Sequence, residues 1–344
     1  MSKLKIGWIL SVDRNTASSR LQGYLIHEWL VRHNIDSHIV AANSCELKGL
    51  RDPRFYQIAK ILYSENFTHV IFEGPEWVGF QISALCKLWG RITLCVRCDN
   101  LKADYDAYFD VTILPTKNLA DSLGVSRRCI IPDCVEVASN QFKLDYSKKT
   151  PKLRVVWVGH QGYRDYLLEL ISRLMENSFV NECVDFVLIS KGDFATIQWN
   201  LDTVFCDVLS CDIAFIPIPV GEWYSGKSSN RLAMMMALGM PTIATPIPSY
   251  KSIAVAARDV LFVESDEEII QSLKLLHSED ARKALGCSAR NSLGDHFGVD
   301  VIAPIWLRAI KEAVNSENKM PVRKLGAKVL ASLIGALSAT GGRN

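Results

Sequence analysis

The chain has 344 residues, of which 49% are hydrophobic and 22% charged, and its formal net charge at pH 7 is +2. This length suits two domains of ordinary size, and the composition is that of a globular protein rather than a disordered one. The small net charge gives no overall attraction to nucleic acid, and no apolar run reaches the roughly 18–20 residues of a membrane-spanning helix. The N-terminus lacks the long apolar core of a signal peptide, and the ten cysteines form no disulfide framework, so we expect a cytoplasmic protein.

In the first 145 residues, short apolar runs alternate with amphipathic stretches. The apolar runs predict strands at 4–10, 37–40, 69–72, 92–96, 111–114 and 129–131. The amphipathic stretches predict helices at 19–33, 55–65, 79–89 and 119–123. Strands that are regularly separated by helices indicate a parallel, doubly wound sheet, and their near-continuous hydrophobicity fits burial on both faces. We therefore expect an α/β domain over residues 1–145.

A polar segment, residues 140–152, carries four lysines and a proline, and we interpret it as a linker. The same alternation then restarts, with strands expected at 153–158, 186–189, 213–216, 242–245 and 261–263. Helices are expected at 163–177, 228–238, 249–257 and 267–277, and from Ala281 onward the sequence is helical without a further strand. A second α/β domain is therefore expected over residues 151–300.

The stretch 227–246 (KSSNRLAMMMALGMPTIATP) is the most informative part of the chain. Ser228 or Ser229 can cap a short helix, which Gly239 and Pro241 end. Lys227 and Arg231, four residues apart, place two cations beside the helix N-terminus, where the helix dipole disfavours positive charge. An anion between them resolves this conflict, so the pattern predicts a phosphate site. The run Met234 to Met236 is interpreted as core packing, although Met234 could lie near the ligand.

This stretch resembles the donor-diphosphate segment of the GT-B glycosyltransferases, and in particular the large retaining family called glycosyl transferases group 1. The family pattern of Asn, a basic residue and Leu, followed by Ala-x-Gly-x-Pro-x-Ile-Ala-Thr, is matched from Asn230 to Thr245. The family's two glutamates, eight residues apart, fall on Gly226 and Met234, so both carboxylates are missing. The resemblance implies two Rossmann-like domains facing across a cleft, with helices at 300–318 crossing back to the first domain.

Ligands of open α/β sheets bind beyond the carboxyl ends of the strands. The loop after 153–158 holds Gly159, His160 and Arg164, and the resemblance makes His160 and Arg164 the nearest matches to two diphosphate-binding basic residues. By the same resemblance, Lys191 lies in the region that reads the nucleotide base. Together with Lys227, Ser228, Asn230, Arg231 and Met234, these residues form the expected donor site.

The expected acceptor side lies in the first domain. Ser18, Ser19 and Arg20 occupy the loop that faces the cleft in the resembling enzymes, with simple helix capping and an exposed Arg20 as the alternative. Arg97 and Asp99 follow the fourth strand, and Asp99 could orient an acceptor hydroxyl. Neither the histidines nor the carboxylates show metal-ligand spacing, so we expect no obligatory metal, and Lys227 and Arg231 would neutralise the leaving diphosphate.

The resemblance implies an enzyme that transfers a sugar from a nucleotide diphosphate to an acceptor hydroxyl, with retention of configuration. Polysaccharide, lipopolysaccharide or glycolipid assembly is the expected setting. Two alternatives stay open. One is a non-catalytic protein that binds nucleotide sugars, which the missing glutamates favour, and the other is a nucleotide-sugar epimerase on the same scaffold.

The C-terminal tail, 319–344, has an apolar helical face over residues 320–337 and basic residues that include Arg323, Lys324 and Lys328. This pattern is typical of a helix lying on an anionic membrane, which would place the protein peripherally on the inner membrane face beside a lipid-linked acceptor. A helix packed on the N-terminal domain or a dimer contact is the alternative.

Overall fold

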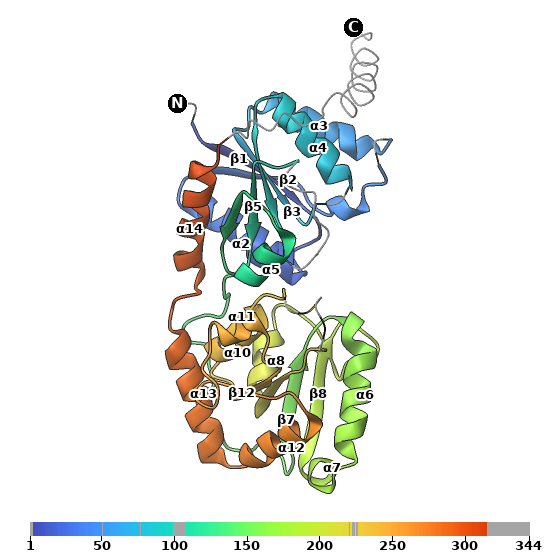
Figure 1. The fold of residues 1–344 in the computed structure, drawn as a ribbon, viewed down its shortest axis with the longest axis vertical. Helices are drawn as coiled ribbons and strands as arrows, with labels where there is room; N and C mark the ends of the chain where they lie inside the picture. The colour runs from blue at the N-terminus through green and yellow to red at the C-terminus, as the bar shows by residue number, and fades with distance from the viewer. Residues whose placement is uncertain are drawn as a thin grey trace. The chain divides into compact units, whose positions relative to one another are not determined.

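The computed structural model describes residues 3–49, 51–75, 77–98, 108–219, 221, 224 and 226–314. The chain divides into two compact units (Figure 1). The first unit comprises the chain up to Asp133 together with the chain from Val299, and the second extends from Cys134 to Gly298. Asp99 and the tail 319–344 lie outside the described residues.

The first unit is a six-stranded parallel sheet in the order β2-β1-β3-β4-β5-β6. Its strands are β1 (Lys5–Leu10), β2 (Asp36–Ala41), β3 (His69–Glu73), β4 (Ile92–Val96), β5 (Val111–Leu114) and β6 (Arg128–Ile130). Its helices are α1 (Ala17–Ser19), η1 (Arg20–Tyr24), α2 (Leu25–Arg32), η2 (Ser44–Glu46), α3 (Pro53–Ser64), α4 (Trp77–Leu88), α5 (Lys117–Leu123) and α14 (Val299–Glu312). The predicted doubly wound parallel sheet is confirmed.

Helices cover both faces of the first sheet. Ile9 and Phe72 point to one face, where they pack with Phe55 of α3 and Ile82 of α4. On the other face, α14 packs along α2, and the ring centroid of Trp306 lies 6.0 Å from that of Trp8 on β1. The helix that the resemblance predicted to cross back does therefore belong to the N-terminal unit.

The second unit is a six-stranded parallel sheet in the order β12-β11-β10-β7-β8-β9. Its strands are β7 (Leu153–Val158), β8 (Val184–Ser190), β9 (Ile197–Gln198), β10 (Ile213–Ile216), β11 (Thr242–Ala244) and β12 (Leu261–Phe262). Its helices are η4 (Gln161–Tyr163), α6 (Arg164–Met175), α7 (Ser178–Cys183), α8 (Val204–Leu209), α10 (Asn230–Ala237), α11 (Pro248–Lys251), α12 (Asp266–Leu275) and α13 (Glu279–Leu293). The short elements β9, α7 and α8 were not predicted from the sequence.

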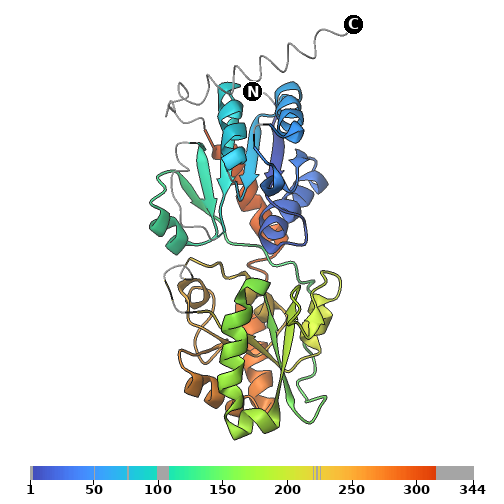
Figure 2. The ribbon, with the colours of Figure 1, turned by 90° about the vertical axis from the view of Figure 1, so that its right-hand side faces the viewer.

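The strands of the second sheet feed two separate cores because successive side chains point to opposite faces. Ala214 and Ile216 of β10 pack with α8 and α10, whereas Ile213 and Phe215 pack with α6 and α12. Figure 2 shows α6 on the near side of this sheet and the orange α13 on its far side. Both faces are thus covered, as a doubly wound fold requires.

The predicted linker at 140–152 is instead packed on the second unit, and the boundary lies earlier, at Asp133. The ammonium group of Lys143 is buried and donates to the backbone oxygen of Cys211 at 2.6 Å. The Tyr146 hydroxyl donates to the Gly239 oxygen at 2.8 Å, and the Arg282 guanidinium donates to the Tyr146 oxygen at 2.6 Å. Lys143 and Tyr146 therefore hold this segment against the second unit, whereas Lys149 is exposed.

Two predicted helices differ in detail. The helix expected at 19–33 is interrupted by the π-helical turn η1, where a Cβ on Gly23 would lie 2.6 Å from Leu10 Cδ2. The helix expected at 249–257 ends at Lys251, because the Asp259 carboxylate accepts from the Val255 N–H at 3.0 Å and a turn follows, with Ala257 at a φ of 61°.

Candidate functional site

The second sheet reverses its strand order at β7, which lies between β10 and β8. In open α/β sheets, ligands bind outside the carboxyl ends of the strands at such a switch point. The loops that leave β7, β8 and β10 at this edge contain most of the residues predicted to bind the donor. The position of the switch point therefore indicates the same loops as a ligand site that the sequence pattern indicated.

Helix α10 follows the loop after β10 and has the predicted start and end. The Gly239 N–H donates to the Met236 oxygen and the Met240 N–H to the Met235 oxygen, both at 2.9 Å, with Gly239 at a φ of 65°. These two bonds form a Schellman motif, which glycine favours because it tolerates a positive φ. At the start of the helix, the Ser228 hydroxyl accepts from the Asn230 N–H at 3.4 Å.

The N-terminal end of α10 offers donors to an anion. Ser229 occupies the N-cap position, but its side chain makes no capping hydrogen bond. Arg231, in the first turn, is half-buried, and its Nη1 atom is buried without a hydrogen-bond partner among the described residues. A charged donor that is desolvated and unpaired costs free energy, so a phosphate oxygen at this position would stabilise the protein. Lys227 lies just before the helix and is also half-buried.

The loop after β7 lies against Arg231. The guanidinium carbon of Arg231 is 5.2 Å from the ring centroid of Tyr163, within range of a cation–π contact. A Cβ on Gly159 would lie 2.2 Å from the Trp157 indole, so only glycine fits beside this ring. His160 is exposed, and its Nδ1 accepts from the Gly162 N–H at 3.0 Å. The neutral ring is therefore protonated on Nε2, which can donate to a ligand.

The loop after β8 adjoins the loop after β7. Arg164 lies 3.7 Å from the Asp193 carboxylate, an exposed ion pair of small energetic value. The Lys191 ammonium group is 5.1 Å from the ring centroid of Trp199, and Trp199 itself packs against the core of this unit.

Met235 and Met236 are buried in the core, and Met234 is half-buried against it. The predicted packing role of this run is therefore confirmed. Thr245 supports the loop after β10, because its hydroxyl accepts from the Ile218 N–H at 2.9 Å. Helix α10 is thus held by packing against the core of the second unit, and the loop that leads to it is held by the hydrogen bond from Ile218 to Thr245.

In the first unit, the residues expected on the acceptor side lie deeper than predicted. Ser19 is fully buried, and its hydroxyl donates to Glu73 Oε2 and accepts from the Val12 N–H at 3.3 Å. Arg20 is 6% exposed and donates to the Arg14 oxygen at 3.2 Å, so the alternative of an exposed Arg20 is wrong. Ser18 is half-buried, and Arg97 is 3% exposed.

Sequence reasoning missed Glu73, which ends β3 at the switch point of the first sheet. Its carboxylate is 2% exposed and also accepts from the Ser11 N–H at 3.1 Å. Burial raises the pKa of Glu73, and the hydrogen bond from Ser19 opposes that shift. The signal was present: a carboxylate directly follows an apolar strand in the sequence HVIFE.

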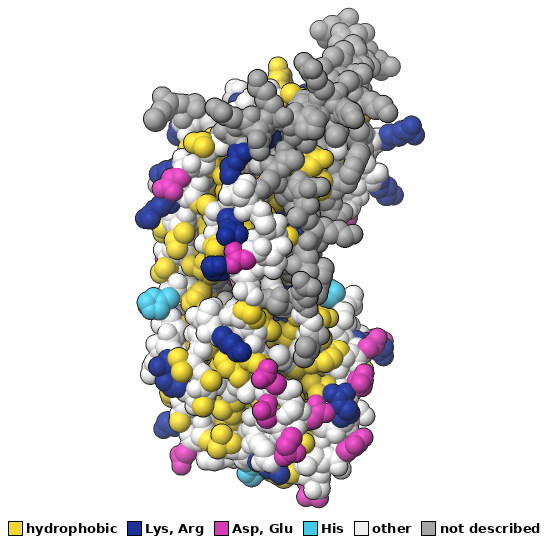
Figure 3. Space-filling model, viewed as in Figure 1, with side chains coloured by type: hydrophobic (Ala, Val, Ile, Leu, Met, Phe, Trp, Pro, Cys, Tyr) yellow, Lys and Arg dark blue, Asp and Glu magenta, His cyan; other side chains and the backbone are white. Residues whose placement is uncertain are grey.

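Lysines, arginines and carboxylates are interspersed over the face drawn in Figure 3, without a large patch of one sign on its described part.

In the described ranges, no group of three His, Cys, Asp or Glu side chains is arranged to hold a metal ion. All ten cysteines carry free thiols. None of the described helices is both long and apolar enough to span a bilayer.

No protein-family model matches the chain, and no curated protein is significantly similar to it in sequence. Solved structures do match. Sucrose-phosphate synthase from Thermosynechococcus elongatus has a TM-score of 0.64 at 12% identity, over 90% of this chain and 98% of that one. A glycosyltransferase from Rickettsia africae has a TM-score of 0.63 at 13% identity, over 92% of this chain and all of that one.

HepE from Anabaena, solved with UDP and glucose, has a TM-score of 0.62 at 10% identity, over 90% of this chain and all of that one. TarM is longer, and the chain spans 58% of it. At these identities the likeness concerns the fold. The chain has the GT-B fold, with two Rossmann-like parallel sheets, as the sequence predicted. The cleft between the two units stays a prediction.

Proposed function

We propose that the second unit binds a nucleotide-diphosphate sugar and that the protein is a glycosyltransferase. The observation that carries this proposal is Arg231, whose Nη1 is buried and has no hydrogen-bond partner among the described residues, at the N-terminal end of α10 and beside the switch point of the sheet. Lys227 supplies a second cation, and His160 a neutral donor. The fold shared with HepE, which was solved with UDP and glucose, supports this assignment.

The chemistry follows from the charge of the leaving group. Cleavage of the bond between sugar and phosphate passes through an oxocarbenium-like state, and the departing diphosphate gains negative charge. Cations that are already in place stabilise that charge without reorganising. Lys227 and Arg231 therefore carry the catalytic electrostatics, with Gly159, Arg164, Lys191, Ser228 and Asn230 as further donor contacts.

The finer assignments rest on the sequence and the family resemblance. Retention of configuration, an acceptor hydroxyl oriented by Asp99, and a role in polysaccharide, lipopolysaccharide or glycolipid assembly are parts of this proposal. So is a membrane-bound tail beside a lipid-linked acceptor. Truncation after Asn318 is expected to abolish sedimentation with anionic vesicles at low salt, and a full-length protein that fails to sediment would remove the membrane part.

A second candidate is a non-catalytic nucleotide-sugar-binding protein. It is favoured by one specific observation: Gly226 and Met234 stand where the resembling family has its two glutamates. Met234 packs against the core of the unit, which suits a position that has lost a polar role.

Turnover separates the two candidates. The protein is incubated with radiolabelled UDP-, GDP-, CDP- and dTDP-sugars, with and without a mixture of sugar and lipid acceptors. An enzyme releases labelled sugar to water or to an acceptor, and the Arg231→Ala variant does so more slowly. Binding of a sugar nucleotide with no release under any condition would support the binding protein instead.

A further inference from the structure

Two tyrosines from different elements meet at Arg231. Tyr163 belongs to η4, after β7, and its ring lies 5.2 Å from the guanidinium carbon. Tyr250 belongs to α11, after β11, and is 1% exposed. The two elements are separated by more than 80 residues in the sequence, so this meeting is a product of the fold.

Tyr250 is buried in the same core cluster as Leu232 and Met235 of α10, the helix that carries Arg231, and its hydroxyl interacts electrostatically with the Arg231 guanidinium. Burial raises the pKa of Tyr250, and the nearby guanidinium opposes this shift because it stabilises the phenolate. Tyr163 also raises the pKa of the Tyr250 hydroxyl, as burial does. The guanidinium and the two phenol rings therefore form one cluster.

Both tyrosines are themselves held firmly. The Tyr163 ring lies 6.1 Å from the Tyr224 ring and 6.4 Å from the Trp157 ring, and its N–H donates to the His160 oxygen at 3.0 Å. Tyr250 is part of the core cluster that also holds Met235 and Met236. An arginine between such partners loses its side-chain freedom on folding, before any ligand arrives.

The alternative interpretation is that the cluster has only a packing role at the carboxyl edge of the sheet. It leaves the buried Nη1 of Arg231 unexplained, because buried donors are normally hydrogen-bonded and this one has no partner among the described residues. A guanidinium held for an anion accounts for both the aromatic contacts and the unpaired donor.

We propose that Tyr163 and Tyr250 are positioning residues, which hold the Arg231 guanidinium in the orientation that binds the diphosphate of the ligand. The proposal rests on the proposed function, since it assumes a nucleoside diphosphate at the N-terminal end of α10. It adds that affinity depends on two aromatic residues that act through Arg231.

The test is a double-mutant cycle on binding, measured by calorimetry with whichever of UDP, GDP, CDP and dTDP binds the wild-type protein most tightly. Tyr163→Leu is expected to weaken binding about 3- to 30-fold, the range of a partly desolvated cation–π contact. Tyr163→Phe keeps the ring and is expected to stay within about twofold. Tyr250→Phe keeps the packing but removes the hydroxyl, and should weaken binding about 2- to 10-fold.

The coupling decides between positioning and packing. In an Arg231→Ala background, Tyr163→Leu should cause no further loss, because the group that it positions is gone. Equal losses with and without Arg231, or no loss in a folded Tyr163→Leu protein, would overturn the inference. Tyr163→Met replaces the leucine variant if that variant does not fold. A wild-type protein that binds none of the four diphosphates would instead overturn the proposed function, and this inference with it.

Discussion

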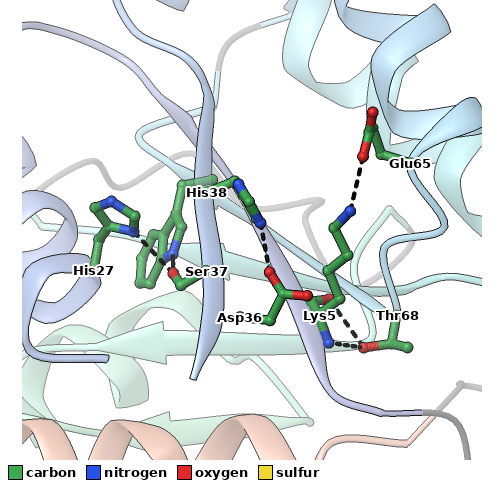
Figure 4. Close-up of polar contacts among 8 residues, drawn as sticks. Lys5, His27, Asp36, Ser37, His38, Glu65 and Thr68 are labelled. Carbon is green, nitrogen blue, oxygen red and sulfur yellow. Dashed lines mark hydrogen bonds and ion pairs between the residues drawn. The ribbon is translucent and has the colours of Figure 1, made fainter. Parts of the chain in front are cut away.

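A histidine in the first unit shows how one side chain can make stability depend on pH. Ser37 on β2 contacts two partners: the Trp8 indole donates to its hydroxyl oxygen at 2.9 Å, and the His27 Nδ1 lies 2.9 Å from the same oxygen (Figure 4). The indole only donates, whereas the serine hydroxyl has one proton and two acceptor lone pairs, so the His27 ring can accept from this hydroxyl or donate to it.

We predict that protonation of His27 destabilises the fold. Burial lowers the pKa of His27 below its ordinary value of 6.5, so the unfolded chain takes up the proton first as the pH falls. The contribution to stability is complete above pH 6.5 and is lost as the pH drops through the folded pKa. Urea unfolding at about pH 7.5 and about pH 5.5 should show a smaller loss for His27→Gln than for the wild type. Equal losses would contradict this account.

The candidate site was only partly predictable at this scale. Lys227 and Arg231 are neighbours along the chain, and their conflict with the helix dipole can be read from spacing alone. The contact of Arg231 with Tyr163 and Tyr250 depends on how three loops converge at the edge of the sheet, and no local pattern reports that. Ser19 was assigned to a ligand because its actual partner, Glu73, lies 54 residues away in the sequence. No local pattern reports a hydrogen bond over that separation.

Two helices of the second unit meet through glycines. A Cβ on Gly286 of α13 would lie 2.3 Å from the Gly239 oxygen, at the end of α10. That oxygen cannot easily move, because Gly239 closes the Schellman turn and its oxygen accepts from the Tyr146 hydroxyl at 2.8 Å. The close approach of α13 thus fixes the C-terminal end of the helix that carries Arg231.

The Gly286→Ala substitution distinguishes packing from helix propensity by the sign of its effect. Propensity alone predicts a gain of about 1 kcal/mol, since alanine is favoured over glycine inside a helix. Overpacking against a fixed carbonyl costs about 1–3 kcal/mol, occasionally more, and we expect a net decrease in the free energy of unfolding. Asn291→Ala, at an exposed position of α13, is the control and should not destabilise the protein. A Gly286→Ala variant that is more stable than the wild type would refute this packing.

The elements themselves were largely predictable, because buried parallel strands have a strong hydrophobic signal. Strands β1 to β5 begin and end within a residue of their predicted limits. The linker prediction failed for a physical reason: Lys143 and Tyr146 look polar, yet they satisfy backbone oxygens in the interior of the second unit. Composition does not distinguish a solvated lysine from a buried, hydrogen-bonded one.

At the scale of the whole molecule, the chain returns to its first unit through α14. Trp306 is 1% exposed against Trp8, and the Trp29 indole donates to the Asp300 carboxylate at 2.8 Å. The first unit is therefore built from two segments that are distant in the sequence, whereas the second unit is continuous.

We expect Trp306→Ala to lower the free energy of unfolding of the first unit by about 3–5 kcal/mol, the usual cost of deleting a large buried aromatic side chain. Because both cores of the second unit consist of its own residues, its unfolding should change little. Ile305→Ala, on the same helix at 42% exposure, is the matched control. Denaturant unfolding followed by hydrogen exchange resolves the two units. An equal loss of protection in both would contradict the division.

The central claim is that Arg231 binds the diphosphate of a nucleotide at the N-terminal end of α10. Calorimetric titration of UDP, GDP, CDP and dTDP into the wild-type, Arg231→Lys and Arg231→Ala proteins tests it most directly. A charge-assisted hydrogen bond contributes about 1.5–3 kcal/mol, so Arg231→Ala should weaken binding roughly 10- to 150-fold. Arg231→Lys should recover only part of this, because the forked donor is lost. A folded Arg231→Ala protein with unchanged affinity would contradict the account.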